Sequence, residues 1–134
     1  MANAIYPLYK QSLLDGDTGT DLNDGTVKVA LCDTGTTSYA STHQYYSDVS
    51  TATIGTPQEI TATTVTNGLF DGGNVTFSTV TGATAEALVI YIEGTAASTS
   101  RLVAYIDTNV TGLPVTPSGG DITVTWNGSG IFQL

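Results

Sequence analysis

Histidine and cysteine, the side chains best suited to acid–base, nucleophilic and metal chemistry near neutral pH, each occur once in this 134-residue chain, as His43 and Cys32. A hydrolase would need His43 beside a nucleophile and an orienting acid. Serines and Asp48 lie close in sequence, but hydroxyl residues are abundant throughout the chain and no Gly-x-Ser-x-Gly motif occurs. We therefore predict no catalytic residue and keep a small hydrolase acting through His43 as one alternative.

Cys32 ends an apolar run over residues 27–32. Such a position favours a buried, unreactive thiol over a reactive one. As the only cysteine it forms no intrachain disulfide. One histidine and one buried cysteine are also too few ligands for a zinc site.

The acidic segment 15–24 has carboxylates at alternate positions, as at the start of a helix-loop-helix calcium loop. Its spacing fails, because position 6 counted from Asp15 is Thr20 instead of glycine and position 12 is Thr26 instead of glutamate. We predict a turn in which Asp and Asn bond their own backbone, with a loosely held cation as the alternative. The prediction for metals and cofactors is therefore none.

The charge of the chain is one-sided, with twelve acidic residues against Lys10, Lys28 and Arg101 and a formal net charge of −9. Nucleic acids and anionic membranes are bound through Lys and Arg, so neither is an expected partner. No apolar run approaches the roughly 20 residues that cross a bilayer, and the first residues lack a secretory pattern. We expect a protein made in a reducing cytoplasm, whose acidity serves solubility or a partner with a basic face.

The composition predicts strands joined by turns, since the chain has 25 threonines, 15 glycines and many valines and isoleucines. Residues 4–14 repeat apolar side chains at helical spacing and predict a short helix, with a strand as the alternative. Residues 34–57 read as a long irregular loop with one helical turn near residues 42–47, and a loop of this length is a candidate functional segment. Predicted strands are 26–33, 59–66, 74–80, 85–93, 101–107, 121–127 and the apolar end 131–134.

Three details of these strands are specific enough to be checked. Asn67–Gly68 is a hairpin-turn signal. The strand at 85–93 is apolar enough to be buried on both faces and should pair with 101–107 as a hairpin. In the strand at 121–127, Ile122, Val124 and Trp126 should face together. We predict one all-β domain over residues 1–134, a jelly-roll-like β-sandwich with a short N-terminal helix.

The sequence also resembles a family of small structural proteins of tailed bacteriophages, over nearly its whole length. The segments that carry the resemblance are AIYPLYKQSLLDG (4–16), VKVALCD with TGT (27–36), HQ (43–44), SDV (47–49), TNG (66–68), Asp71 with VTF (75–77), ALVIY (87–91), TSRLVAYID (99–107), GLPVTP (112–117) and GGDI (119–122). The resemblance implies a capsid decoration or cement protein on the outer surface of the virion. Its implied partner is the major capsid protein, bound by a dimer or trimer on the symmetry axes of the shell.

Aromatic and terminal positions supply candidate contacts with that partner, because tyrosines are favoured at protein interfaces and a free strand can extend a partner's sheet. The candidates are Ile5, Tyr6, Leu8, Tyr9, Tyr39, His43, Tyr45, Tyr46, Phe132 and Leu134. The alternative is that the aromatic rings have no partner and only cover the ends of the sandwich. A tail- or fibre-associated module that binds host-surface glycan is the alternative function.

Overall fold

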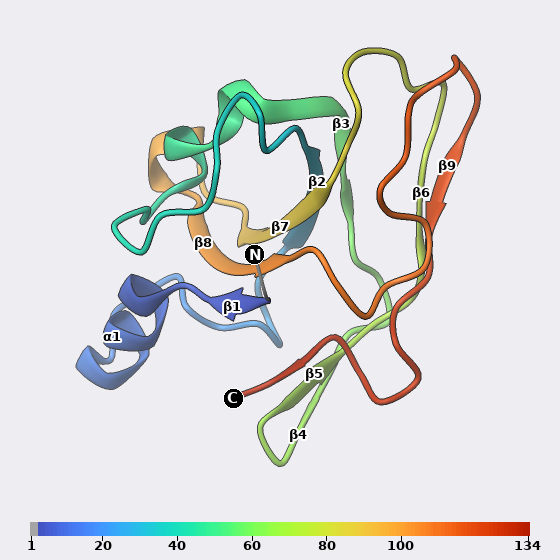
Figure 1. Ribbon diagram of the computed structural model, residues 1–134. Helices are drawn as coiled ribbons and strands as arrows, with labels where there is room; N and C mark the ends of the chain where they lie inside the picture. Colours follow the sequence, from blue (N-terminus) through green and yellow to red (C-terminus); the bar gives the residue numbers. More distant parts are fainter. Residues whose placement is uncertain (1–2) are drawn as a thin grey trace.

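The computed structural model describes residues 3–134 (Figure 1). Its largest element is a five-stranded antiparallel sheet in the order β1 (Ala4–Ile5), β8 (Arg101–Ile106), β7 (Ala87–Ile92), β2 (Val27–Cys32), β3 (Thr53–Glu59). All six residues of β7 are buried, and β2 is buried except at Lys28. The two most continuously apolar segments therefore lie in the middle of the sheet, where both faces are covered.

Two smaller antiparallel sheets complete the β structure. In one, β6 (Val75–Phe77) pairs with β9 (Ile122–Val124). In the other, the order is β10 (Phe132–Gln133), β5 (Leu69–Asp71), β4 (Thr64–Thr66). Each of these strands is short because its alternating pattern is bounded by turn residues. The chain is thus mostly β, as the composition predicts.

The one α-helix within residues 3–134, α1 (Pro7–Asp15), begins where Pro7 fits the first turn. It ends at Gly16, whose positive φ of 71° lets the N–H groups of Gly16 and Asp17 reach the carbonyls of Leu13 and Ser12. The predicted helix is confirmed over these residues, but Ala4 and Ile5 instead form β1 on the edge of β8. Three 3₁₀ turns, η1 (Tyr46–Asp48), η2 (Ser50–Ala52) and η3 (Ala97–Thr99), lie in the connections. None of the helices in residues 3–134 has the length and hydrophobicity to span a membrane.

The prediction for residues 53–66 was wrong in its boundaries. Residues 53–59 form β3, inside the segment expected to be irregular, and the chain then bends before β4 begins at Thr64. Pairing with the buried strand β2 outweighs the turn-like composition, since Leu31 lies opposite Ile54 and Lys28 opposite Glu59. Pro57 is tolerated because β3 is the sheet edge, where a missing N–H leaves no partner unpaired.

The other strand predictions are confirmed. The β7–β8 hairpin forms with Ile90 opposite Ala104, and Asn67–Gly68 closes the β4–β5 hairpin. Ile122, Val124 and Trp126 are buried while the threonines between them are exposed. The apolar segment at 131–134 joins a sheet through β10 and β5.

Candidate partner-binding surface

Two predicted contact residues, Tyr6 and Tyr9, are buried in the core, so the prediction that their side chains are offered to a partner is corrected. Tyr6 is 0% exposed and Tyr9 is 3% exposed. Both side chains belong to the hydrophobic core. Burial raises the pKa of both phenols, that of Tyr9 to about 12. Ile5 and Leu8 are half-buried beside them.

The tyrosines of the long loop fold back onto the sheet. The Tyr39 ring lies between Tyr6 and Tyr105, with centroid distances of 5.3 and 5.5 Å. Tyr46 stacks on Tyr91 at 4.2 Å, with an interplanar angle of 14°, and its hydroxyl makes a hydrogen bond with the Thr53 hydroxyl. These contacts hold the loop against the sheet and leave the rings only half-exposed.

His43 and Asp48, the pair closest to a catalytic arrangement in the sequence, lie near enough to interact electrostatically, but no hydrogen bond between their side chains is formed in the described residues. The Asp48 carboxylate accepts the backbone N–H groups of Gln44 at 2.8 Å and Tyr45 at 3.0 Å. These donors lower the pKa of Asp48, because they stabilise its charged form. The His43 side chain is half-buried, and its Nδ1 has no hydrogen-bond partner in the described chain. Asp48 therefore serves as a cap for η1.

Cys32 is buried and free, as predicted. Burial raises the pKa of its thiol to about 12. Among residues 3–134, no group of three or more His, Cys, Asp or Glu side chains could hold a metal ion.

One concave surface lined by predicted contact residues is an open groove of about 400 Å³. We call it the α1–β10 groove. Its lining comes from α1, the loop 20–23 and the β10–β5–β4 sheet, namely Tyr9, Leu13, Thr20, Asp21, Leu22, Asn23, Val65, Gly68, Phe70, Phe132 and Leu134. Segments from both ends of the chain and from its middle therefore meet there.

The floor and rim of the α1–β10 groove follow from strand register. Val65 and Phe132 each lie opposite Phe70, so the three side chains form one row across β4, β5 and β10. Phe70 is buried and its ring is 5.3 Å from that of Phe132, while Val65 and Leu134 are 48% and 60% exposed. The row supplies an apolar floor with exposed apolar ends.

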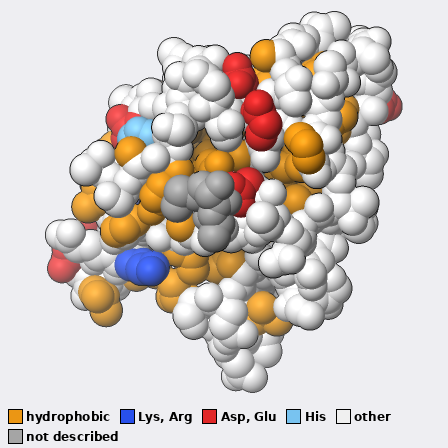
Figure 2. All heavy atoms as spheres, in the orientation of Figure 1, with side chains coloured by type: hydrophobic (Ala, Val, Ile, Leu, Met, Phe, Trp, Pro, Cys, Tyr) orange, Lys and Arg blue, Asp and Glu red, His pale blue; other side chains and the backbone are white. Residues whose placement is uncertain are grey.

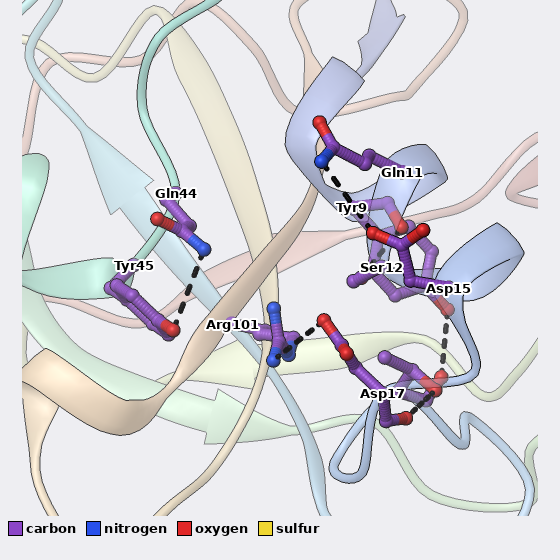
Figure 3. A network of polar contacts seen from close by, with 9 residues as sticks. Tyr9, Gln11, Ser12, Asp15, Asp17, Gln44, Tyr45 and Arg101 are labelled. Carbon is purple, nitrogen blue, oxygen red and sulfur yellow. Dashed lines mark hydrogen bonds and ion pairs between the residues drawn. The ribbon is translucent and has the colours of Figure 1, made fainter.

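The acidic loop forms the opposite wall and is fixed by the network in Figure 3. The Tyr9 hydroxyl donates to the Thr20 carbonyl at 2.9 Å, and the Thr20 hydroxyl donates to the Asp17 carbonyl at 3.0 Å. Arg101, on β8, pairs with the Asp17 carboxylate at 3.5 Å and lies 5.7 Å from the centre of the Tyr45 ring. The wall is therefore tied to both α1 and β8.

Within that loop, the Asp21 carboxylate accepts the backbone N–H groups of Asn23 at 2.7 Å and Asp24 at 3.2 Å. The predicted turn, in which an Asp side chain bonds its own backbone, is confirmed. Two of the three basic side chains are also engaged, since Lys28 pairs with Glu93 at 3.0 Å and Arg101 with Asp17. Most of the acidic charge is left facing solvent or a partner.

Of the predicted contact residues, Phe132, Leu134 and the buried Tyr9 line this groove. Its other apolar lining residues, Leu13, Leu22, Val65 and Phe70, were not among the predicted contacts. The alternation of residues 64–71 around Asn67–Gly68 does place Val65 and Phe70 on one face. Nothing local in the sequence indicates that α1 and residue 22 line the same groove as that face.

No family of known proteins has a model that matches this sequence, and no curated protein matches it.

Proposed function

We propose that this chain is a capsid decoration protein of a tailed bacteriophage, a jelly-roll-like β-sandwich that binds the outside of the head shell and stabilises contacts between major capsid subunits. The resemblance across residues 4–122 supports the family. The three antiparallel sheets are consistent with such a fold. The role is structural binding without turnover.

The observation that carries the proposal is the α1–β10 groove. An open apolar concavity with exposed leucine and valine at its rim is typical of protein-binding surfaces. One or two apolar side chains of a capsid subunit entering it would contribute about 1.5–3 kcal/mol each. Such a contact is weak for one copy, but an oligomer that places linked copies on neighbouring equivalent sites of the shell would bind strongly.

The uncompensated acidic charge supports a capsid face with exposed basic side chains as the complement. It would steer association and fix orientation, while the groove contributes apolar burial. We therefore expect binding that weakens as salt rises but is not abolished by it.

The first experiment locates the chain in purified particles by quantitative gel stoichiometry and particle imaging. The proposal predicts hundreds of copies on the head, as a repeating shell requires. A handful of copies at the tail, or none in the particle, would contradict it.

The second experiment tests the groove itself, by adding purified chain to heads from which it has been deleted. Leu134→Asp places a charge on the groove rim and should reduce occupancy at least about tenfold, since a buried unpaired carboxylate costs several kcal/mol. Leu14→Asp is the matched control, because Leu14 is 90% exposed on α1 and does not line the groove. Equal occupancy by both variants would remove the groove from the proposal.

Glycan binding remains the alternative function, and the structure gives it one hollow of about 200 Å³ beside Tyr46 and Tyr91. Sugar recognition by stacking needs an open ring face. Tyr46 and Tyr91 already cover one face of each other, and Arg101 lies over Tyr45. Tail location in the imaging experiment, together with sugar binding that is lost in Tyr46→Ala, would favour this alternative.

A further inference from the structure

The outer strand of the small sheet, β4, has one free edge. Within residues 3–134, β4 pairs only with β5, and Thr64, Val65 and Thr66 are all exposed. Figure 1 shows the β4–β5 hairpin projecting away from the five-stranded sheet. Natural edge strands are usually protected by charges, prolines or bulges. β4 carries none of these, so its edge is open to another strand.

The hairpin geometry decides which backbone groups face outward. Asn67 and Gly68 both have positive φ, 52° and 79°, as in a two-residue type I′ turn. In such a hairpin the residues next to the turn, Thr66 and Leu69, exchange hydrogen bonds, and the pattern alternates along the strand. The N–H and C=O of Val65 therefore point away from β5, toward the open side.

The sequence of β4 reads the same in both directions, Thr64–Val65–Thr66. A second copy of the strand laid antiparallel against it places Val65 opposite Val65 and Thr64 opposite Thr66. Such antiparallel self-pairing is an isologous two-fold interface, in which each contact occurs twice, whatever the sequence of the strand. A partner strand of another protein would not share that symmetry by default.

The distribution of charge over the chain also favours a second copy as the partner of the β4 edge. Each chain carries a net charge of −9, so two copies repel over most of their surfaces. Residues 60–70 contain no Asp, Glu, Lys or Arg, and this uncharged stretch includes all of β4. The projecting lobe at the bottom of Figure 2 correspondingly shows neither blue nor red side chains on this face. Here two like-charged copies can approach without burying or opposing a charge.

We infer that β4 pairs with β4 of a second copy, forming a two-fold dimer with a six-stranded sheet, β10-β5-β4-β4-β5-β10. The paired Val65 residues join two copies of the Val65–Phe70–Phe132 row into one apolar strip. The dimer forms in the free chain and does not depend on capsid binding. On a shell, it would present two α1–β10 grooves at a fixed separation.

The interface centres on one three-residue strand per copy, well below the surface of about 1,200 Å² that stable complexes bury. We therefore expect a weak dimer, with a dissociation constant on the order of 100 μM, compared with submicromolar values for standard interfaces. Such affinity matters mainly where copies are held close together.

A single-cysteine crosslink tests the pairing directly. Cys32 is buried, so Val65→Cys would carry the one accessible thiol of the described residues. Facing residues of an antiparallel pair lie about 5.5 Å apart between Cα atoms, a distance that a disulfide spans. Under mild oxidation, Val65→Cys should form a covalent dimer at least about tenfold faster than Thr56→Cys, an exposed residue on the edge strand β3. Equal rates would overturn the inference.

A charge pair gives an independent test that also controls for folding. Val65→Lys and Val65→Glu should each sediment as a monomer at a concentration where the wild-type chain is half dimeric, because like charges face each other across the two-fold axis. An equal mixture of the two folded variants should recover dimers. A mixture that stays monomeric, or a wild-type chain that is monomeric at about 1 mM, would refute the pairing.

Discussion

Phe70 is predicted to be the residue on which the β10–β5–β4 sheet and the groove depend most. Its side chain is 1% exposed and lies in the centre of the row formed with Val65 and Phe132. Phe70→Ala removes a fully buried ring, a change that costs about 3–5 kcal/mol. Part of this cost, about 0.5–1.5 kcal/mol, is the aromatic pair with Phe132, whose ring lies 5.3 Å away.

The assay is urea unfolding followed by fluorescence of Trp126, the only tryptophan of the chain. The Trp126 indole N–H donates to the Gly73 carbonyl at 2.9 Å, just beyond β5, so it reports on the altered region. With a urea slope of about 2 kcal/mol/M, a loss of about 4 kcal/mol lowers the midpoint by about 2 M. Phe70→Leu is the matched control and should lose only about 1 kcal/mol, because it keeps most of the buried volume.

Two outcomes would refute this reasoning. A loss below about 1 kcal/mol for Phe70→Ala would mean that the ring is not packed in the hydrophobic core. A marked fall in the urea slope would mean that the small sheet unfolds separately from the five-stranded sheet. A double-mutant cycle with Phe132→Ala should give a coupling of about 0.5–1.5 kcal/mol, as expected for contacting rings.

Two further predictions follow from the pKa shifts. With its pKa raised to about 12, native Cys32 should react with a thiol reagent at pH 8 at least about 10³-fold more slowly than in the urea-unfolded chain, and comparable rates would show that the thiol is exposed. The pKa of Asp48 is lowered from 3.8 by the N–H groups of Gln44 and Tyr45, so its contribution to stability is present above that value and is lost as pH falls through the lower, folded pKa. Asp48→Asn should therefore lower the melting temperature at pH 7, with the difference from wild type shrinking toward pH 2; a difference independent of pH would contradict the assignment.

The local sequence pattern was sufficient to predict two kinds of element: those whose hydrogen-bond partners lie near in sequence, and strands that are buried on both faces. β7 and β2 were recognisable because a short apolar run rich in β-branched residues favours a strand covered on both faces. The turn at Asn67–Gly68 was recognisable because positive φ at both positions favours those residues. The alternation of Ile122, Val124 and Trp126 likewise determined which side of β9 faces the core.

Tertiary structure decided what these elements cover. β3 forms at residues 53–59 because β2 offers it a ladder of backbone hydrogen bonds, a fact that Gly55 and Pro57 do not indicate locally. Tyr6 and Tyr9 could equally have been surface contacts, since a tyrosine has an apolar body and a polar tip; packing of α1 buried them. The α1–β10 groove exists only because residues 13, 22, 65, 70 and 132 converge from distant parts of the chain. Sequence periodicity determines which face of a strand or helix is apolar. Which other element covers that face depends on the free energy gained by burying apolar surface throughout the folded chain, so it is decided only by the tertiary structure.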